Sequence, residues 1–499
     1  MLYTLGHKKV DCYMNKSVKT NVILNVLRIL LSVLFPLITF PYASRVLKVD
    51  NLGMVNYTLS IVNYFALFAA LGISSYAIRE GAKYRDNAEE LRKFVEQVFT
   101  INIISTVLSY SALFFLLLVS SSLKQYRLLI LIQSLTILFT TIGVDWINTI
   151  FEDYVYIIIR SFLVQLTFVV LLFILVKSKN DYIQYASLSV VSGAIISVSN
   201  LFHCKKYVSI KLTKNINLKR HLTPIMIFFV NVLTISIYVN SDTTMLGRLT
   251  SNYYVGIYTA ATKPYNMIKG LLAGMYLVTV SRLSYYVSHD DTDSFYNLIE
   301  KIIYGLMLLL FPAIVAVFCL SEDVVLVLSG SDFIEASVTL KLLSIGLFFA
   351  VVGGFFTNCI NAPNNRERIN LFASAISAIV NIGANFVLIP FMRQNGAAIT
   401  TVIAECIIFI ICLHKSKDIL LRHKYHMIKY YMRDSLFGTL IVIICCLFAR
   451  TISSNPLIHI MIAAGISLPV YTVYLIMIKN MLAVQIWNSF KSKVGMILK

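Results

Sequence analysis

Charged residues are scarce in this chain. Only 13% of its 499 residues are Asp, Glu, Lys or Arg, whereas 58% are hydrophobic and the mean hydropathy is +0.77. A soluble globular domain has roughly 25% charged residues, so the composition excludes a protein whose whole surface faces water. Long polar stretches are missing too, which leaves no room for an independent soluble domain between the apolar segments.

Acidic residues are the scarcer of the two charge types. The chain holds 24 Asp and Glu against 43 Lys and Arg, which gives a net charge of +19. The basic residues stand mostly in short loops between apolar runs, so the excess indicates membrane topology and not a nucleic-acid partner. The eight cysteines show no metal-ligand spacing, and we therefore expect neither a metal site nor a cofactor. The first apolar run, near 21–42, is too long for a cleavable signal peptide.

Apolar runs long enough to cross a bilayer recur along the chain. About 20 apolar residues cross the ~30 Å of hydrocarbon as a helix, and lipid favours helices because they satisfy their own backbone polar groups. The sequence thus predicts an all-α polytopic membrane protein with about fourteen spans. These are expected near 21–44, 54–78, 94–119, 127–150, 155–176, 183–203, 223–247, 254–280, 298–320, 338–361, 369–391, 396–413, 436–452 and 457–478.

Basic residues divide unevenly between alternate loops. The set of loops that includes both termini holds 30 Lys and Arg, and the other set holds 10. The positive-inside rule therefore predicts that both termini are cytoplasmic, in a multi-pass protein of the cell membrane. The expected segments are a cytoplasmic N-terminal segment (1–20), an N-lobe of spans 1–6 (21–204), a basic inter-lobe loop (205–222), a C-lobe of spans 7–12 (223–414), a basic cytoplasmic loop (415–435), and spans 13 and 14 with the tail (436–499).

A weak internal repeat relates the two predicted lobes. At an offset of 203, Arg45 to Gly53 aligns with Arg248 to Gly256, and Arg79 aligns with Arg282. A second offset, of 210, pairs Asn148 with Asn358. Six spans in each half make the repeat parallel, the arrangement that some transporters use to enclose a cavity between two lobes. Coincidence between two Arg-bounded hairpins is the alternative.

Polar residues inside spans are the candidate functional residues, because charge at membrane depth is costly and usually faces a cavity or the bundle interior. We expect the following residues to line a substrate cavity: Arg28, Arg45, Asp145, Asn148, Asp242, Arg248, Lys263 and Lys269. Glu405 is a candidate for ion coupling, and a buried hydrogen-bonded carboxyl is the alternative that its position favours. Lys263 is the sharpest case, because it lies deep in a span and Pro264 follows it. The arginines are equally consistent with snorkelling to headgroups, and the acids with interhelical ion pairs.

Three stretches carry a resemblance to a known family. They are FPLITFPYASRVLKVDNLGMVNY at 35–57, SDTTMLGRLTSNYYVGIYTAATKPYN at 241–266, and 358–405, which begins NCINAPNNRERIN. With these the chain resembles the polysaccharide repeat-unit flippases, the Wzx type, of the multidrug/oligosaccharidyl-lipid/polysaccharide (MOP) exporter superfamily. The resemblance implies two six-helix lobes around a central cavity, alternating access, and two extra C-terminal spans.

The resemblance also implies a cargo and partners. Such proteins move undecaprenyl-pyrophosphate-linked oligosaccharide units from the inner to the outer leaflet, for capsule, O-antigen or exopolysaccharide synthesis. The implied partners are membrane lipids, a polysaccharide polymerase and glycosyltransferases. Two alternatives stay open from the residues alone. One is a drug or cation antiporter of the same superfamily, and the other is a membrane polymerase or glycosyltransferase; the flippase reading predicts a transporter and not an enzyme.

Overall fold

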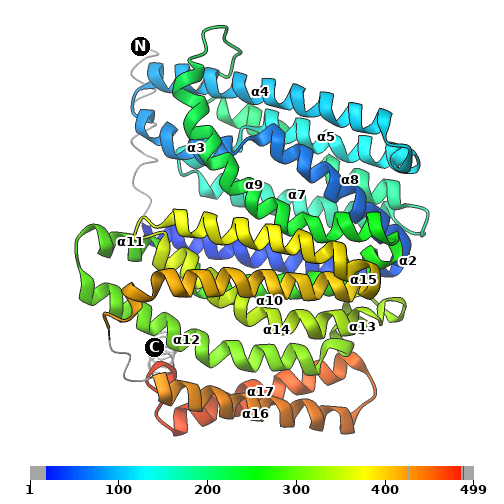
Figure 1. The fold of residues 1–499 in the computed structure, drawn as a ribbon, viewed down its shortest axis with the longest axis vertical. Helices are drawn as coiled ribbons and strands as arrows, with labels where there is room; N and C mark the ends of the chain where they lie inside the picture. Colours follow the sequence, from blue (N-terminus) through cyan, green and yellow to red (C-terminus); the bar gives the residue numbers. More distant parts are fainter. Residues whose placement is uncertain (1–17, 424–427, 485–486, 488–499) are drawn as a thin grey trace, which may run out of the picture. The chain divides into compact units, whose positions relative to one another are not determined.

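The computed structural model describes residues 18–423, 428–484 and 487. Over these residues the regular structure is helical, and no strand occurs in them (Figure 1). The side chains of 18–33 and of four positions in the middle of α9 lie outside the description. The prediction of an all-α protein is therefore confirmed.

The helices of the first half follow the predicted spans closely. They are α2 (Val18–Ala70), α3 (Ile73–Gly81), η1 (Ala82–Tyr84), α4 (Ala88–Val119), η2 (Ser121–Tyr126), α5 (Arg127–Gly143), α6 (Asp145–Ile150), α7 (Tyr154–Leu175) and α8 (Tyr182–Cys204). The second half continues with α9 (Leu218–Leu249), α10 (Asn252–Leu277), α11 (Val280–Ser288), α12 (Thr292–Cys319), α13 (Ser321–Leu328), η3 (Ser331–Phe333), α14 (Ala336–Phe355), the π-helix η4 (Phe356–Asn361), α15 (Glu367–Leu420), α16 (Ile428–Ile452) and α17 (Pro456–Met477).

Ten helices of the described residues are long and apolar enough to cross a membrane. Two of them, α2 and α15, have 53 and 54 residues and are each two helices joined across a kink. The kinks lie at Lys48 (φ 64°) and Arg393 (φ 52°), in a region of backbone conformation that few non-glycine residues adopt. Both α9 and α10 also have spanning length, and their polar residues lower their hydropathy. Counted this way, the helices account for the fourteen predicted spans.

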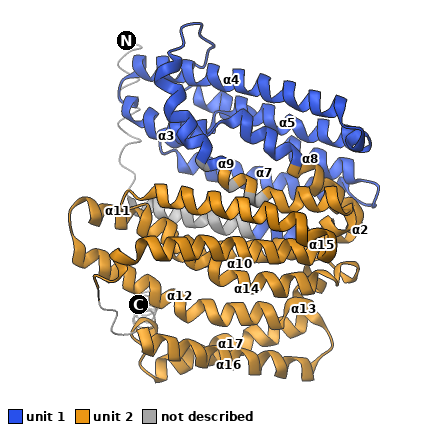
Figure 2. Ribbon diagram, in the orientation of Figure 1, with its two compact units in different colours: residues 1–39, 61–233 blue, residues 40–60, 234–499 orange. Residues whose placement is uncertain are grey.

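The chain forms two compact units (Figure 2). Unit 1 comprises residues 1–39 and 61–233, and unit 2 comprises 40–60 and 234–499. The hairpin 40–60, which comes from the N-terminal part of the chain, therefore packs within unit 2. The helices α16 and α17 also belong to unit 2, where α16 packs against α12.

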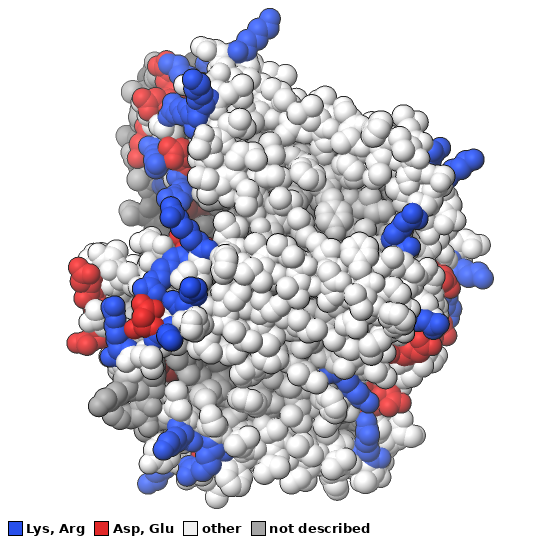
Figure 3. All heavy atoms as spheres, viewed as in Figure 1, with Lys and Arg blue, Asp and Glu red and all other residues white. Residues whose placement is uncertain are grey.

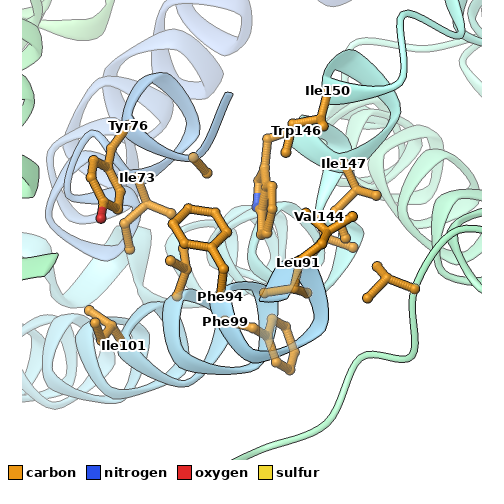
Figure 4. Close-up of a cluster of buried hydrophobic side chains, with 14 of the residues drawn as sticks. Ile73, Tyr76, Leu91, Phe94, Phe99, Ile101, Val144, Trp146, Ile147 and Ile150 are labelled. Carbon is orange, nitrogen blue, oxygen red and sulfur yellow. The ribbon is translucent and has the colours of Figure 1, made fainter. Parts of the chain in front are cut away.

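A hydrophobic cluster at one end of unit 1 is built from short helices (Figure 4). Ile73 and Tyr76 of α3 meet Phe94 of α4, and Trp146 and Ile147 of α6 complete the cluster. The helix α3 is amphipathic and begins after the left-handed residues Leu71 and Gly72. A Cβ on Gly72 would lie 2.7 Å from the backbone nitrogen of Phe229, so glycine allows α9 to approach closely here. Burial of the apolar face of α3 fixes the chain reversal that follows α2.

In unit 2 the repeat brings two equivalent glycines together. A Cβ on Gly53 would lie 1.8 Å from the carbonyl oxygen of Asn252 and 2.7 Å from the nitrogen of Gly256. A Cβ on Gly256 would lie 2.2 Å from the carbonyl oxygen of Val49. The hairpin 40–60 and the start of α10 thus pack backbone against backbone, and only glycine permits that approach.

Charged side chains gather at helix ends in each unit. On the face in Figure 3, Lys, Arg, Asp and Glu lie near the two ends of the helices, and an uncharged band lies between them. Exposed large apolar residues such as Leu118, Phe391 and Ile444 belong to the long helices. A surface of this kind is compatible with lipid and not with water, in agreement with a multi-pass membrane protein.

Candidate functional site

Lys263 lies in the middle of α10, eleven residues from its first residue, and its side chain is exposed. The next residue, Pro264, is buried and has no N–H to donate within the helix. No ion-pair partner of Lys263 occurs among the described residues. The Lys263 ammonium is thus an exposed charge in the middle of a helix of spanning length, where a solitary charge is costly.

A second lysine of α10 is paired with the carboxylate that the sequence singled out for ion coupling. Lys269 Nζ donates to Glu405 Oε1 of α15 in a salt bridge. The Lys269 side chain keeps 31% of its surface exposed, whereas that of Glu405 keeps 5%. Burial of a carboxylate is costly unless a cation and hydrogen bonds compensate it, and Lys269 supplies the cation here.

Asp242 of α9 is buried in the same unit, with donors from two other helices. Its carboxylate accepts hydrogen bonds from the Tyr258 hydroxyl at 2.9 Å, from Thr401 Oγ1 at 2.5 Å, and from the amides of Asn381 and Asn385 at 3.1 and 2.7 Å. Only 3% of Asp242 is exposed. Four neutral donors satisfy the Asp242 carboxyl oxygens without a cation, so Asp242 fastens α9 to α10 and to both halves of α15.

Unit 1 holds a corresponding polar cluster of different composition. Asp145 of α6 accepts from Arg160 Nη1 of α7 and from Asn200 Nδ2 of α8, both at 2.9 Å. Asn148 donates to Asn200 at 3.1 Å. The Asp145 side chain is 54% exposed and that of Arg160 only 7%. In unit 1 the exposed Asp145 thus pairs with the buried Arg160. In unit 2 the polarity is reversed, because the partly exposed Lys269 pairs with the buried Glu405.

The remaining predicted arginines lie elsewhere. Arg45 donates to the carbonyls of Leu326 and Val327 at 3.1 and 2.6 Å, and so caps the C-terminal end of α13. Arg248 is exposed in the last turn of α9, where a cation is favourable to the helix dipole. The side chain of Arg28 lies outside the described residues. Of the predicted basic residues, Lys263 and Lys269 therefore lie together on α10, whereas Arg45 is bonded to the end of α13.

Sequence reasoning missed several members of these clusters. Asn381 and Asn385 are one turn apart in an otherwise apolar stretch, so two amides at that spacing were the available signal. Arg160, the seventh residue of α7, is likewise not among the predicted cavity residues. At the second offset of the predicted repeat, Asn358 donates to the Gly354 carbonyl within its own segment, whereas the fully buried Asn361 bonds to Asn370 and Ser416 of α15.

In each unit a charge clamp links the start of one helix to the end of the helix that runs back beside it, across α7 and α8 in unit 1 and across the two halves of α15 in unit 2. In unit 1, Asp153 accepts from His203 Nε2 at 2.8 Å, from Lys206 Nζ at 2.9 Å and from the Tyr207 hydroxyl at 2.8 Å. In unit 2, Arg366 donates to both carboxylate oxygens of Asp418, at 2.8 and 2.7 Å. The acid precedes the base in the chain in unit 1 and follows it in unit 2.

Burial alone would disfavour ionisation of Asp153, but the hydrogen bonds from His203, Lys206 and Tyr207 outweigh it and hold the pKa of this carboxyl well below its usual range. Its charge therefore stabilises the fold above the unfolded pKa of about 4, and this contribution is lost as the pH falls through the lower folded value. Asp153→Asn is expected to lower the free energy of unfolding by about 1–3 kcal/mol at neutral pH.

Thermal unfolding in detergent over a pH series checks this prediction. The gap between Asp153→Asn and the unmodified protein should narrow as the pH falls below about 4. Asp86→Asn, which changes an exposed carboxylate of the same unit, is the matched control and should leave the unfolding temperature unchanged. Equal unfolding temperatures for the two variants at every pH would contradict the assignment.

A family model described as "Polysaccharide biosynthesis protein" matches residues 18–287, which is more than half of the chain. The chain belongs to this family. A member of the same biosynthetic class, the capsular polysaccharide biosynthesis protein CapF of Staphylococcus aureus, is 25% identical over 378 residues. The alignment covers 72% of this chain and 89% of CapF.

Solved structures show the fold of this family member. The lipid II flippase MurJ in an inward closed conformation matches with a TM-score of 0.73 at 16% identity, over 92% of this chain and all of the other. An inward-facing multidrug resistance MATE family transporter of the MOP superfamily matches with a TM-score of 0.62 at 14% identity, over 84% of this chain and 98% of the other. These likenesses show the fold, and they do not by themselves select a substrate.

Proposed function

We propose that this protein is a flippase that carries pyrophosphate-linked oligosaccharide lipids across the membrane by alternating access. The observation that carries the proposal is the accessible Lys263 in the middle of α10, in a chain that belongs to a polysaccharide biosynthesis family and has the MurJ fold. The cargo is a polyprenyl pyrophosphate, expected to be undecaprenyl pyrophosphate, that bears a sugar repeat unit.

The apolar tail and the anionic head of this cargo have different requirements, and the lysines of α10 meet those of the head. Its tail is apolar and can remain in lipid, whereas the pyrophosphate and the glycan need a polar environment. Lys263 and Lys269 supply cations on one helix, and lysine acts toward phosphate as a mobile point charge. Outward movement of a pyrophosphate with about two charges is also favoured by an inside-negative potential, at roughly 2.3 kcal/mol per charge per 100 mV.

A drug or cation antiporter is the second candidate, because a MATE transporter shares the fold. A cationic substrate needs accessible carboxylates that lack a fixed cation. In unit 2, Asp242 is fully bonded and buried, and Glu405 is paired with Lys269. In unit 1 the accessible Asp145 is paired with Arg160. The accessible charges on α10 are positive, which favours the anionic cargo.

The proposal includes a location and partners. The protein would lie in the cytoplasmic membrane with both termini inside, load cargo on the cytoplasmic side and release it outside. Glycosyltransferases of the same pathway would supply the cargo, and a polymerase would consume it. The predicted cavity-lining roles of Asp145, Asn148, Asp242, Arg248, Lys263 and Lys269 are part of this proposal.

Reconstitution tests the function directly. Purified protein in liposomes of phosphatidylethanolamine and phosphatidylglycerol is given a fluorescent polyprenyl pyrophosphoryl sugar, and a membrane-impermeant quencher reports which leaflet holds it. We expect translocation that depends on the protein, and none of a cationic dye under the same conditions. Dye export together with a static lipid would instead identify an antiporter.

A further inference from the structure

The segment 205–220 of unit 1, which runs from the end of α8 into the first turn of α9, carries positive charge and no negative charge. Its sequence is KKYVSIKLTKNINLKR, which holds six Lys and Arg and no Asp or Glu. Lys206 is paired with a carboxylate of the same unit. Lys211, Lys214 and Lys219 are exposed and have no ion-pair partner among the described residues. The segment therefore presents three ammonium groups within nine residues of chain.

This segment is packed against the body of unit 1, as a green loop beside α4 in Figure 1. Val208 is buried, and Ile210 and Ile216 pack on the hydrophobic cluster of α3, α4 and α6. The backbone N–H of Thr213 donates to Thr100 Oγ1 of α4 at 3.1 Å. Apolar side chains of the segment thus face the cluster, and the lysines between them stay exposed, so the positive charges are held in place beside α4.

The contact with Thr100 places the segment where the charged end of α4 meets its apolar run. Glu96 is the last charged residue of α4, and 98–119 hold none. Ile104 and Leu108, in the turns after Thr100, are exposed, as lipid contact requires, and Leu212 of the segment is 63% exposed. An outward leucine among lysines suits a membrane interface, where apolar side chains enter the acyl boundary and ammonium groups meet phosphates.

Carboxylates of the neighbouring helix do not neutralise the segment. Two of the three glutamates of α4 are paired with bases of their own helix, Glu89 with Lys93 and Glu96 with Arg92. The lysines of the segment are therefore available to an external anion. A basic stretch that directly follows a spanning helix attracts anionic lipid headgroups, and here it does so at the level where the apolar run of α4 begins.

We propose that the outward side of segment 205–220 binds the phosphodiester headgroups of anionic phospholipids, with Lys211, Lys214 and Lys219 as the cations and Leu212 in the acyl boundary. An acidic soluble protein is the other class of partner with suitable charge. The position beside the apolar run of α4 favours lipid, because a soluble partner has no access to that part of the helix. The site lies within unit 1 and does not depend on which cargo the protein transports.

Native mass spectrometry of the full chain in detergent tests the site. Phosphatidylglycerol and phosphatidylcholine are titrated separately, and the fraction of protein with bound lipid gives an affinity for each. Phosphatidylglycerol should bind more tightly. The triple variant Lys211→Gln, Lys214→Gln and Lys219→Gln should bind it roughly 10–100-fold more weakly, since each lysine near an anionic surface contributes up to about fivefold.

Two matched variants distinguish this site from a general effect of charge. Arginine in place of the same three lysines keeps the cations and should keep the affinity for phosphatidylglycerol. The triple variant Lys124→Gln, Lys177→Gln and Lys179→Gln removes three exposed lysines of the same unit, from the loops that follow α4 and α7, and should bind as the unmodified protein does. Inorganic phosphate, titrated against bound phosphatidylglycerol, should not displace it.

Each other outcome overturns the proposal. Equal affinity for the two lipids, or equal losses in the two glutamine variants, would show that segment 205–220 is no specific site. Displacement by inorganic phosphate would identify a site for a free anion. Unchanged lipid affinity in the segment variant, with surface polysaccharide lost in cells while transport in liposomes persists, would assign the segment to an acidic protein partner. The flippase proposal is independent of all these results.

Discussion

Replacing Lys263 by Ala is expected to abolish surface polysaccharide while the protein stays at its normal level in the membrane. Lys263 is the accessible cation in the middle of α10 that has no ion-pair partner among the described residues, so its loss removes the charge available to a pyrophosphate without unpairing an acid. A hydrogen bond to a charged group contributes about 1.5–3 kcal/mol, which corresponds to roughly 10–150-fold in cargo affinity. Surface polysaccharide by immunoblot, beside the membrane level of tagged protein, gives the measurement.

Two further variants show whether export depends on the positive charge at position 263 or on the loss of any lysine of unit 2. Lys263→Arg keeps the cation and should restore part of the export, although its planar fork replaces a compact ammonium. Lys301→Ala removes an exposed lysine of α12 in the same unit and should leave export intact. Full export by Lys263→Ala would remove this residue from the cargo site.

Gly256→Ala is expected to disrupt the packing of the hairpin 40–60 and to abolish transport. The added Cβ would stand 2.2 Å from the carbonyl oxygen of Val49 and 3.0 Å from its carbonyl carbon. Both atoms belong to the backbone, so no side-chain rotation relieves the clash. Overpacking of this kind typically costs 1–3 kcal/mol, and the displaced backbone also carries the Gly53 contact. The unfolding temperature in detergent and the transport of the probe lipid report the two effects.

The same helix provides the control. A Cβ on Gly270 would meet nothing within 4 Å, so Gly270→Ala should be tolerated, and helix propensity favours alanine by about 0.5–1 kcal/mol. A lower unfolding temperature for Gly256→Ala but not for Gly270→Ala would confirm the close packing. If both variants behave alike, the effect is one of helix propensity and the interpretation of Gly53 and Gly256 is wrong.

The helices could be predicted because the structure of each apolar run depends on its own composition. A run of about 20 apolar residues becomes a helix in lipid whatever its neighbours are, so the spans follow from local composition alone. Gly53 and Gly256, which end the two aligned stretches of the predicted repeat, stand out in the sequence because backbone contact at both positions tolerates no side chain.

Partners distant in the chain could not be predicted in this way. Glu405 bonds to Lys269 across 136 residues, and Arg45 bonds to Leu326 across 281. Nothing local distinguishes an arginine that caps α13 from one that faces a cavity, since both need only a long cationic side chain at a helix end. The assignment of the hairpin 40–60 to unit 2 likewise depends on tertiary contacts, and predictions from span order placed it in the N-lobe.

The two charge clamps have a consequence for the history of the chain. If both halves descend from one duplicated gene, Asp153 with Lys206 and Arg366 with Asp418 are one ancestral pair whose polarity was inverted in a single half. Such an inversion needs both positions to change, because either change alone places like charges together. Paired replacements preserve the architecture while they erase residue identity, so on that condition the kinship of the halves would be recorded in which positions interact and hardly at all in which amino acids occupy them.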